Sequence, residues 1–473
     1  MRIPFILAYL TAGCLGALAA PSNVIVILVD DLGQTDVSCY GSRFYETPNI
    51  DRLAKDGVRF SDGYSACTVC SPTRAALLTG KYPARLRLTD WISGHDRPKA
   101  KLKVPDWRKY LPLEEITLAE QFKAAGYATA SIGKWHLTPG LTSGDEEYYP
   151  EKHGFDVNVG GTAQGQPPSY VAPYRIATIG DGPAGEFLTD REAREAVKFI
   201  EANKDRPFFL YLPHYAVHTP ITGKPEVAAK YARKAAADPA LRQRHAAYAA
   251  LVESVDDALG TIRAALCRLG IDQRTIIVFT SDNGGLLMRN HQATDNAPYR
   301  MGKGSAYEGG VRVPLIIHAP GQTRPGFVEP TPAMTIDIYP TVLELAGVKP
   351  LESLVDGISL GGLLKHGTKP VRTELFWHYP HYHPGGATPY SAIRSGDLRL
   401  VHFYEDGRDE LFDLSADAGE TQDLAYARPA QAKALRSRLD SWLNSVDAQL
   451  PTPNPAYDPT ETSAPRTKPP QKR

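Results

Sequence analysis

Apolar and polar positions alternate along this chain in two patterns, one typical of buried strands and one of amphipathic helices. The run Asn23–Val29 is continuously apolar and rich in β-branched residues, which predicts a central parallel strand buried on both faces. Strand-like and helical segments then alternate as far as residue 346. This order predicts an α/β fold with a mostly parallel central sheet flanked by helices. The later strands are expected at Tyr127–Ile132, Phe208–Leu212, Thr275–Thr280 and Val313–His318, and the helices at Thr117–Ala125, Glu192–Asn203, Ala246–Leu269 and Ile338–Ala346.

The pattern changes near Pro350, where shorter strand-like segments begin. This change predicts a large domain over residues 21–350 and a smaller one over residues 351–449. Residues 450–473 are rich in Pro, Thr and Lys and are predicted to be a disordered tail. The segments expected in the smaller domain are strands at Thr373–His378, Ser391–Ser395, Leu398–Tyr404 and Glu410–Leu414, and one helix at Pro429–Asn444.

The N-terminal segment has the composition of a secretory signal. Arg2 is followed by a nearly continuous apolar run to Leu18 and by small residues at Ala19 and Ala20. We therefore expect a signal peptide over residues 1–20 and a chain exported to the periplasm or secreted. A retained membrane anchor is the alternative, although the run is short for a spanning helix. Cys14 leaves lipidation as a further alternative.

Charge and cysteine content exclude some classes of protein. The 53 basic and 53 acidic residues balance, so nothing indicates a nucleic-acid partner or broad binding to a membrane surface. Beyond the signal segment the cysteines are too few for a disulfide framework, although one bridge is possible in an oxidising compartment. These cysteines are Cys39, Cys67, Cys70 and Cys267.

Acidic and amide side chains follow two of the expected strands. Asp30 and Asp31 come directly after the first strand, and Asp282 and Asn283 come after the strand that ends at Thr280. Ligands of open α/β sheets lie beyond the carboxyl ends of the strands, so these side chains are expected near one another. Oxygen ligands of this kind suit Ca²⁺, or less often Mg²⁺. Taken alone, either pair also fits a helix cap or a solvated turn.

The segment Cys70–Gly80 is the most informative in the chain. It is expected to form a helix, with Pro72 in the first turn and good helix formers from Ala75 onward. Cys70 and Arg74 are four residues apart and are therefore expected on one helix face. A helix start favours a bound anion. The alternative is an ordinary buried cysteine at a helix cap.

The spacing Cys70-x-Pro72-x-Arg74 resembles the maturation motif of the type I sulfatases, which are members of the alkaline-phosphatase-like superfamily. Further segments match the same family over Asn23 to about Asn444. The resemblance implies a large alkaline-phosphatase-like α/β domain and a small C-terminal antiparallel-sheet subdomain with one helix. The matching segments are D-D-L-G from Asp30, G-K-W-H-L from Gly133, H-T-P from His218, S-D-N-G from Ser281, the stretch Gly302–Pro314, and E-L-F-D-L from Glu410.

The resemblance also implies a chemistry. In this family the cysteine is oxidised to Cα-formylglycine by a formylglycine-generating enzyme or an anaerobic maturase, and one Ca²⁺ is bound. Carried over residue by residue, the implied metal ligands are Asp30, Asp31, Cys70, Asp282 and Asn283. The implied catalytic residues are Cys70, Arg74, Lys134, His136, His218 and Lys303, and Asp282 is a plausible proton acceptor. His214 is expected to be structural, and Glu308 and Arg312 are expected to hold a loop in place.

The expected activity is hydrolysis of a sulfate monoester, with a sulfated carbohydrate or an aryl sulfate as substrate. One alternative is a phosphomonoesterase or phosphonate hydrolase of the same superfamily, and another is a catalytically inactive carbohydrate-binding homologue. Polar and aromatic residues that could line a sugar pocket, or could equally be structural, are Thr89, Asp90, Trp91, His95, His378, His381 and His383.

Overall fold

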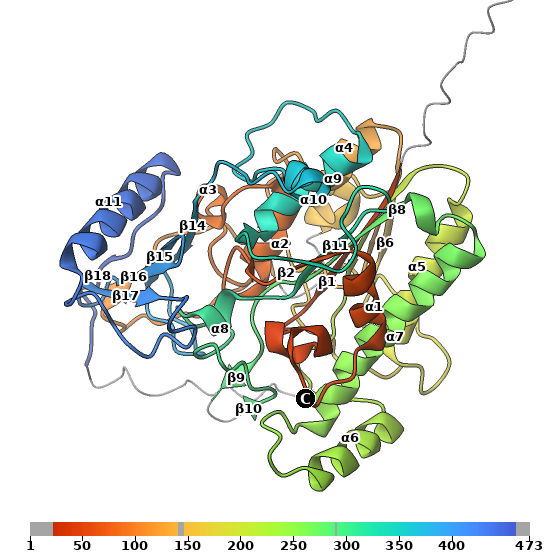
Figure 1. Ribbon diagram of the computed structural model, residues 1–473, viewed down its shortest axis with the longest axis horizontal. Helices are drawn as coiled ribbons and strands as arrows, with labels where there is room; N and C mark the ends of the chain where they lie inside the picture. Colours follow the sequence, from red (N-terminus) through yellow and green to blue (C-terminus); the bar gives the residue numbers. More distant parts are fainter. Residues whose placement is uncertain (1–21, 141–145, 289–290, 460–473) are drawn as a thin grey trace, which may run out of the picture.

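A computed structural model describes residues 22–140, 146–288 and 291–459 and places a large mixed sheet at the centre of the molecule (Figure 1). The expected signal peptide, residues 1–20, lies outside the described residues. Within the described part, the strand order of this sheet is β12-β2-β11-β8-β1-β7-β5-β6. The strands are β1 Asn23–Val29, β2 Val58–Phe60, β5 Ala128–Ile132, β6 Val157–Val159, β7 Phe208–Pro213, β8 Thr275–Ser281, β11 Leu315–His318 and β12 Phe327–Glu329.

Strand β1 lies in the middle of the sheet, as its uninterrupted apolar sequence predicts. It pairs in parallel with β7 on one side and β8 on the other. Parallel pairing continues through β5 and β6, whereas β11 runs antiparallel to both β8 and β2. The predicted α/β class with a mostly parallel sheet is therefore confirmed.

Helices cover both faces of the sheet because successive residues of β1 point to opposite sides. Ile25, Ile27 and Val29 pack in one apolar cluster with helices α1, α5, α6 and α7. Val24, Val26 and Leu28 pack in a second cluster with α2, α4, α9 and α10. These helices are α1 Pro48–Asp56, α2 Cys70–Thr79, α4 Leu118–Ala124, α5 Leu188–Ala202, α6 Pro225–Ala237, α7 Ala246–Arg268, α9 Ile338–Ala346 and α10 Gly361–His366.

The C-terminal part forms the expected small subdomain, drawn in blue in Figure 1. Its antiparallel sheet has the order β14-β15-β16-β17, and helix α11 (Pro429–Ser445) packs on it. The subdomain shares an apolar cluster with residues of the large domain, including Tyr64 and Val69, so the two parts have a common core. The strands are β14 Glu374–Tyr379, β15 Tyr390–Ser395, β16 Leu398–Phe403 and β17 Arg408–Asp413.

Short elements complete the described chain. They are strands β3 Gly63–Tyr64, β4 Leu102–Lys103, β9 Leu287–Met288, β10 His291–Gln292, β13 Ala333–Met334 and β18 Thr452–Pro453, helices α3 Pro83–Leu86 and α8 Glu308–Val311, and 3₁₀ turns Gln34–Asp36, Ser38–Tyr40, Glu146–Tyr148, Pro150–His153, Asp272–Arg274 and Thr335–Asp337. Across the parts of the chain just described, no helix has both the length and the apolar character needed to cross a bilayer.

Three departures from the expected elements have simple causes. The strand expected from Val313 begins at Leu315, since Pro314 has no N–H to give to a neighbouring strand. Helix α5 begins four residues before Glu192, with Leu188 buried in the core. The tail expected to be disordered from residue 450 is ordered at its start, where β18 pairs with β4.

Candidate active site

The strand-end side chains meet at one edge of the sheet. Asp30 and Asp31 follow β1 and Asp282 follows β8, two strands that are paired in register along their whole length. The backbone N–H of Asp31 donates to Asp282 Oδ1 at 3.1 Å, and Asn283 Nδ2 donates to Asp31 Oδ1 at 2.8 Å. The structure therefore brings together the four residues expected here, although about 250 positions separate them in sequence.

Helix α2 carries the cysteine to the same place. It begins at Cys70, is buried along its length, and ends where Gly80 adopts a left-handed conformation with φ +68°. One potential ligand atom from each of Asp30, Asp31, Cys70 and His218 lies within 4.8 Å of the others. His218 thus belongs to this group, whereas the family resemblance implied it as a catalytic residue and not as one of the metal ligands.

Three cations neutralise the carboxylates. Lys134 Nζ lies 2.6 Å from Asp30 Oδ2, and Lys303 Nζ lies 2.6 Å from Asp31 Oδ1 and 3.6 Å from Cys70 Sγ. Arg74 is fully buried, and its guanidinium donates to Asp282 Oδ2 at 2.7 Å and to the Lys134 carbonyl at 2.9 Å. Arg74 therefore holds Asp282 in place at the acidic edge, and Lys303 lies beside the sulfur.

The acidic residues fit a bound cation. Burial and the neighbouring Asp282 raise the pKa of Asp30 to about 8, so another positive charge would stabilise its ionised form. Burial also opposes ionisation of Asp31, but Lys303 and His218 outweigh it and hold that pKa below its ordinary value. Asp30 Oδ1 and Asn283 Oδ1 are buried and accept no hydrogen bond from the described residues. Unpartnered oxygens of this kind are hard ligands suited to Ca²⁺ or Mg²⁺.

The unmodified thiol of Cys70 is poorly suited to attack a substrate. Burial raises its pKa to about 11, although Lys134 and Lys303 act in the opposite direction. Because the thiolate is the reactive form of cysteine, the free thiol is largely inert at neutral pH.

His136 is held in one orientation beside the cysteine helix. Its Nε2 is hydrogen bonded to the carbonyl of Ile92, so Nε2 carries the proton and Nδ1 is the basic atom. Nδ1 is buried and has no partner among the described residues. The ring lies against Gly165, where an ideal Cβ would come within 2.6 Å of it. Burial and Lys134 lower the pKa of His136 well below its usual value, which keeps the ring neutral.

The site opens toward solvent on one side. The side chains of Asp30, Arg74 and Lys134 are completely buried, whereas 9% of Lys303 and 14% of His218 are exposed. A substrate must therefore approach past these two residues. His214 does not join the group, because it is buried against Glu192 with Nδ1 2.6 Å from the carboxylate, as its expected structural role requires.

Two supporting contacts were not expected from the sequence. Ser71 donates from Oγ to the His136 carbonyl at 2.9 Å and accepts from the backbone N–H of Ile92 at 3.1 Å, which ties the loop after residue 88 to the site. The hydroxyl of Tyr248 lies 2.7 Å from Asp36 and 3.2 Å from the Asp31 carbonyl. Neither contact has a sequence signal, because each joins segments that meet only in the folded chain.

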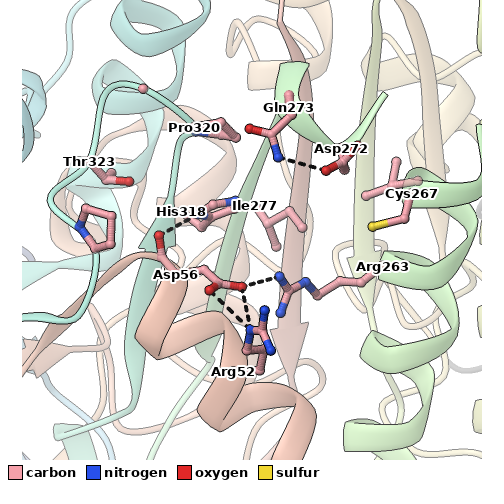
Figure 2. Close-up of a pocket in the computed structure, with 13 residues that line it drawn as sticks. Arg52, Asp56, Arg263, Cys267, Asp272, Gln273, Ile277, His318, Pro320 and Thr323 are labelled. Atoms are coloured by element: carbon pink, nitrogen blue, oxygen red, sulfur yellow. Dashed lines mark hydrogen bonds and ion pairs between the residues drawn. The ribbon is translucent and has the colours of Figure 1, made fainter. Parts of the chain in front are cut away.

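A separate hollow of about 400 Å³ lies at the opposite end of the sheet (Figure 2). It is lined by residues near the start of β8 and the end of β11, including Ile277 and His318. Asp56 points between Arg52 and Arg263 and pairs with both, so its charge is neutralised locally (Figure 2). None of the residues expected to be functional lies in this hollow.

Comparisons with known proteins agree with this fold. The family model described as Sulfatase matches residues 22–348, and a second model, N-sulphoglucosamine sulphohydrolase, C-terminal, matches residues 301–449. The chain belongs to the sulfatase family and is a sulfuric ester hydrolase, which confirms the family, the enzyme class and the fold expected from the sequence.

Individual relatives cover nearly the whole chain. A sulfatase of Formosa agariphila is 35% identical and is aligned over 89% of this chain and 88% of its own length. Arylsulfatase A of Homo sapiens is 33% identical and is aligned over 92% of this chain and 89% of its own length. The crystal structure of Ps i-CgsB in complex with k-i-k-neocarrahexaose superposes with a TM-score of 0.74 at 29% identity, covering 93% of this chain and 96% of that one.

Proposed function

We propose that this sulfatase hydrolyses sulfate monoesters of a carbohydrate, using a formylglycine made from Cys70 and one bound Ca²⁺. The observation that carries the proposal is the convergence of Asp30, Asp31, Cys70 and His218 on one centre. Lys134 and Lys303 stand beside that centre. Such a site can bind and neutralise the oxygens of an anionic ester.

The donor set supports the metal assignment. Asp30, Asp31, residue 70, Asp282 and Asn283 would hold the ion, and the two unpartnered oxygens of Asp30 and Asn283 are available to it. When bound, the ion supplies a fixed positive charge that polarises the sulfate oxygens.

Oxidation of Cys70 would replace an inert thiol by a reactive group. The hydrated aldehyde supplies two hydroxyl groups, one to attack sulfur and one whose deprotonation expels sulfate. The unpartnered Nδ1 of His136 is available to accept the proton of the second hydroxyl. A formylglycine-generating enzyme or an anaerobic maturase would be the partner that performs the oxidation.

The remaining residues bind and orient. Lys134 and Lys303 would bind sulfate oxygens, with Lys303 and His218 on the exposed side toward the departing alcohol. Arg74 is fully buried, is bonded to Asp282 and the Lys134 carbonyl, and lies 3.6 Å from Asp30, so we assign it the role of holding these residues in place. Asp282 keeps the role of proton acceptor proposed from the sequence.

A carbohydrate leaving group is favoured over a simple aryl group by the structural relative that binds an oligosaccharide. The signal-like segment before Pro21 supports export to the periplasm or the outside of the cell, where sulfated polysaccharides occur. Fractionation of the producing cells tests this location, and retention of the full-length chain in the cytoplasm would contradict it.

Mass spectrometry of the peptide that contains Cys70 tests the nucleophile, in the same preparation used for activity. We expect formylglycine at residue 70 and faster release of nitrophenol from nitrophenyl sulfate than from the matching phosphate or phosphonate. Activity with an unmodified Cys70 would refute the nucleophile, and preference for a phosphorus ester would favour the phosphohydrolase alternative. A converted protein that binds sulfated sugars without turnover would favour the inactive homologue.

A further inference from the structure

The exposed side of the site is bordered by residues that neither the sulfate chemistry nor the metal requires. They come from the loop around residues 89–109 and from the segment after β14, two parts of the chain far apart in sequence. Thr89 and His381 join these segments through a side-chain contact of 2.8 Å. This border is where the organic part of a substrate would lie.

The three histidines at the end of β14 and in the segment after it differ in their surroundings. His378 is buried and bonded to the Ser391 hydroxyl and the Gln449 carbonyl. His381 is buried and bonded to Thr89, with Trp107 packed against its ring. Both have structural roles, and His381 Nδ1 also lies 3.9 Å from the Asp90 carboxylate. The ring of His383 is instead held through Nδ1, by a hydrogen bond from the backbone.

His383 is fixed next to Lys303. Its ring lies so close to Gly304 that an ideal Cβ there would meet Nδ1 at 1.7 Å. The backbone N–H of Gly385 donates to His383 Nδ1 at 2.9 Å, so the ring proton is on Nε2. Burial and Lys303 lower the pKa of His383 to about 3, which keeps the ring neutral. Nε2 is therefore an oriented hydrogen-bond donor beside the lysine that faces the departing alcohol.

Aromatic and basic residues continue this surface. The rings of His95 and His383 are 5.9 Å apart, and Trp91 Nε1 donates to His95 Nδ1 at 3.2 Å. Arg97 is partly exposed and lies over the ring of Tyr382, the neighbour of His383, at 6.0 Å. It forms no ion pair with any carboxylate of the described residues, whereas the nearby Lys99 pairs with Asp458 at 3.8 Å.

The local charge is positive although the whole chain is neutral. Residues 96–109 contain six basic and two acidic residues. A positive segment beside an anion-binding site attracts substrates that carry more than one negative charge. An unpaired guanidinium is also well suited to a planar carboxylate or a sulfate oxygen pair.

We propose that His95, Arg97 and His383 bind the leaving group, and that this group is a sugar carrying a second anionic substituent besides the sulfate that is cleaved. His383 Nε2 donates to a hydroxyl or ring oxygen next to the ester. Arg97 binds the second anion, which is either another sulfate or a uronate carboxylate. This assignment rests on the proposed sulfatase function.

The test compares substrates and variants in preparations whose Cys70 conversion has been verified. A panel of monosulfated sugars first identifies the best substrate. Its counterparts with a second sulfate or with a uronate carboxylate are then compared by kcat/KM. We expect kcat/KM for at least one counterpart to be about tenfold to a hundredfold higher than for the monosulfated sugar. This is the gain that one hydrogen bond to a charged group provides. The better of the two identifies the chemistry of the second anion.

Variants locate the effect. Arg97→Gln should remove this advantage, whereas Lys101→Gln, a matched change of an exposed charge in the same segment, should preserve it. His383→Asn should lower kcat/KM on the sugar substrates at least about tenfold more than on nitrophenyl sulfate. His383→Gln, whose amide can reach the position of Nε2, should recover part of that loss. Thermal unfolding of each variant reports whether the fold is intact.

The outcomes separate the two proposals. A converted wild-type protein that hydrolyses no sulfate ester refutes the proposed function itself. If sulfate esters are hydrolysed, the binding assignment is overturned by the lack of any advantage for the doubly anionic sugars, by persistence of that advantage in Arg97→Gln, or by equal loss in Lys101→Gln.

Discussion

Replacement of Lys303 by methionine should damage catalysis in a way that depends on the leaving group. Lys303 Nζ lies 2.6 Å from Asp31 and 3.6 Å from Cys70 Sγ, and only 9% of the side chain is exposed. Burial acts to lower its pKa, but Asp31 and the other nearby anions outweigh burial and hold the pKa above its ordinary value. The group is therefore a fixed cation at every pH at which the enzyme would be assayed.

The size of the effect follows from where negative charge develops. Loss of one preorganised donor at a buried reacting oxygen costs about 10² to 10³ in kcat. A sugar alcohol is a poor leaving group and needs the full effect of this cation. Nitrophenolate is a stable anion and leaves with less help from a nearby cation. We therefore expect kcat to fall only about tenfold for nitrophenyl sulfate.

The assay measures kcat and kcat/KM on a sulfated sugar and on nitrophenyl sulfate, with conversion of residue 70 checked by mass spectrometry. Lys433→Met, a change of an exposed lysine on α11, is the matched control and should alter neither substrate. Equal losses on both substrates would refute the reasoning, because Lys303 would then act on binding or on the fold and not on the departing oxygen.

Four further outcomes follow from the structure. Cys70→Ala should abolish release of nitrophenol, and activity in that variant would contradict the nucleophile assignment. Chelation should lower activity and the unfolding temperature, with recovery on adding Ca²⁺. Because the pKa of Asp30 is raised to about 8 without the ion, Ca²⁺ must displace a proton below that pH. Its Kd should then fall up to about tenfold between pH 6 and pH 7 in calorimetry, and a Kd independent of pH would exclude this coupling. Arg399→Met should cost about 3 to 5 kcal/mol in denaturant unfolding, because Glu308 and Glu420 lose a buried partner. Arg408→Met is the control, because it removes an exposed ion pair with Asp406 and should cost only about 0 to 1 kcal/mol.

Much of the fold follows from local sequence. The unbroken apolar run Asn23–Val29 can be stable only where both faces are covered, and it forms the central strand β1. The helix that starts at Cys70 and ends at Gly80 was expected from its composition and its final glycine. Asp30 and Asp282 could be assigned to one sheet edge, because each directly follows a parallel strand.

Other features depend on contacts between distant segments, which no local pattern encodes. Three histidines lie within six positions, yet His378 and His381 are bonded inside the protein and His383 alone faces Lys303. The tail resembles a disordered segment in composition, but Thr452–Pro453 finds a partner strand about 350 residues away.

The side chains that could carry the chemistry were recognisable along the chain, because residue types and strand ends are local properties. That His218 joins Asp30, Asp31 and Cys70 around one centre became visible only in the folded chain. The folded structure also shows that Arg74 is completely buried against Asp282, whereas part of Lys303 is exposed. These properties need the fold because burial, ring tautomers and ion pairs depend on neighbours that only folding brings together.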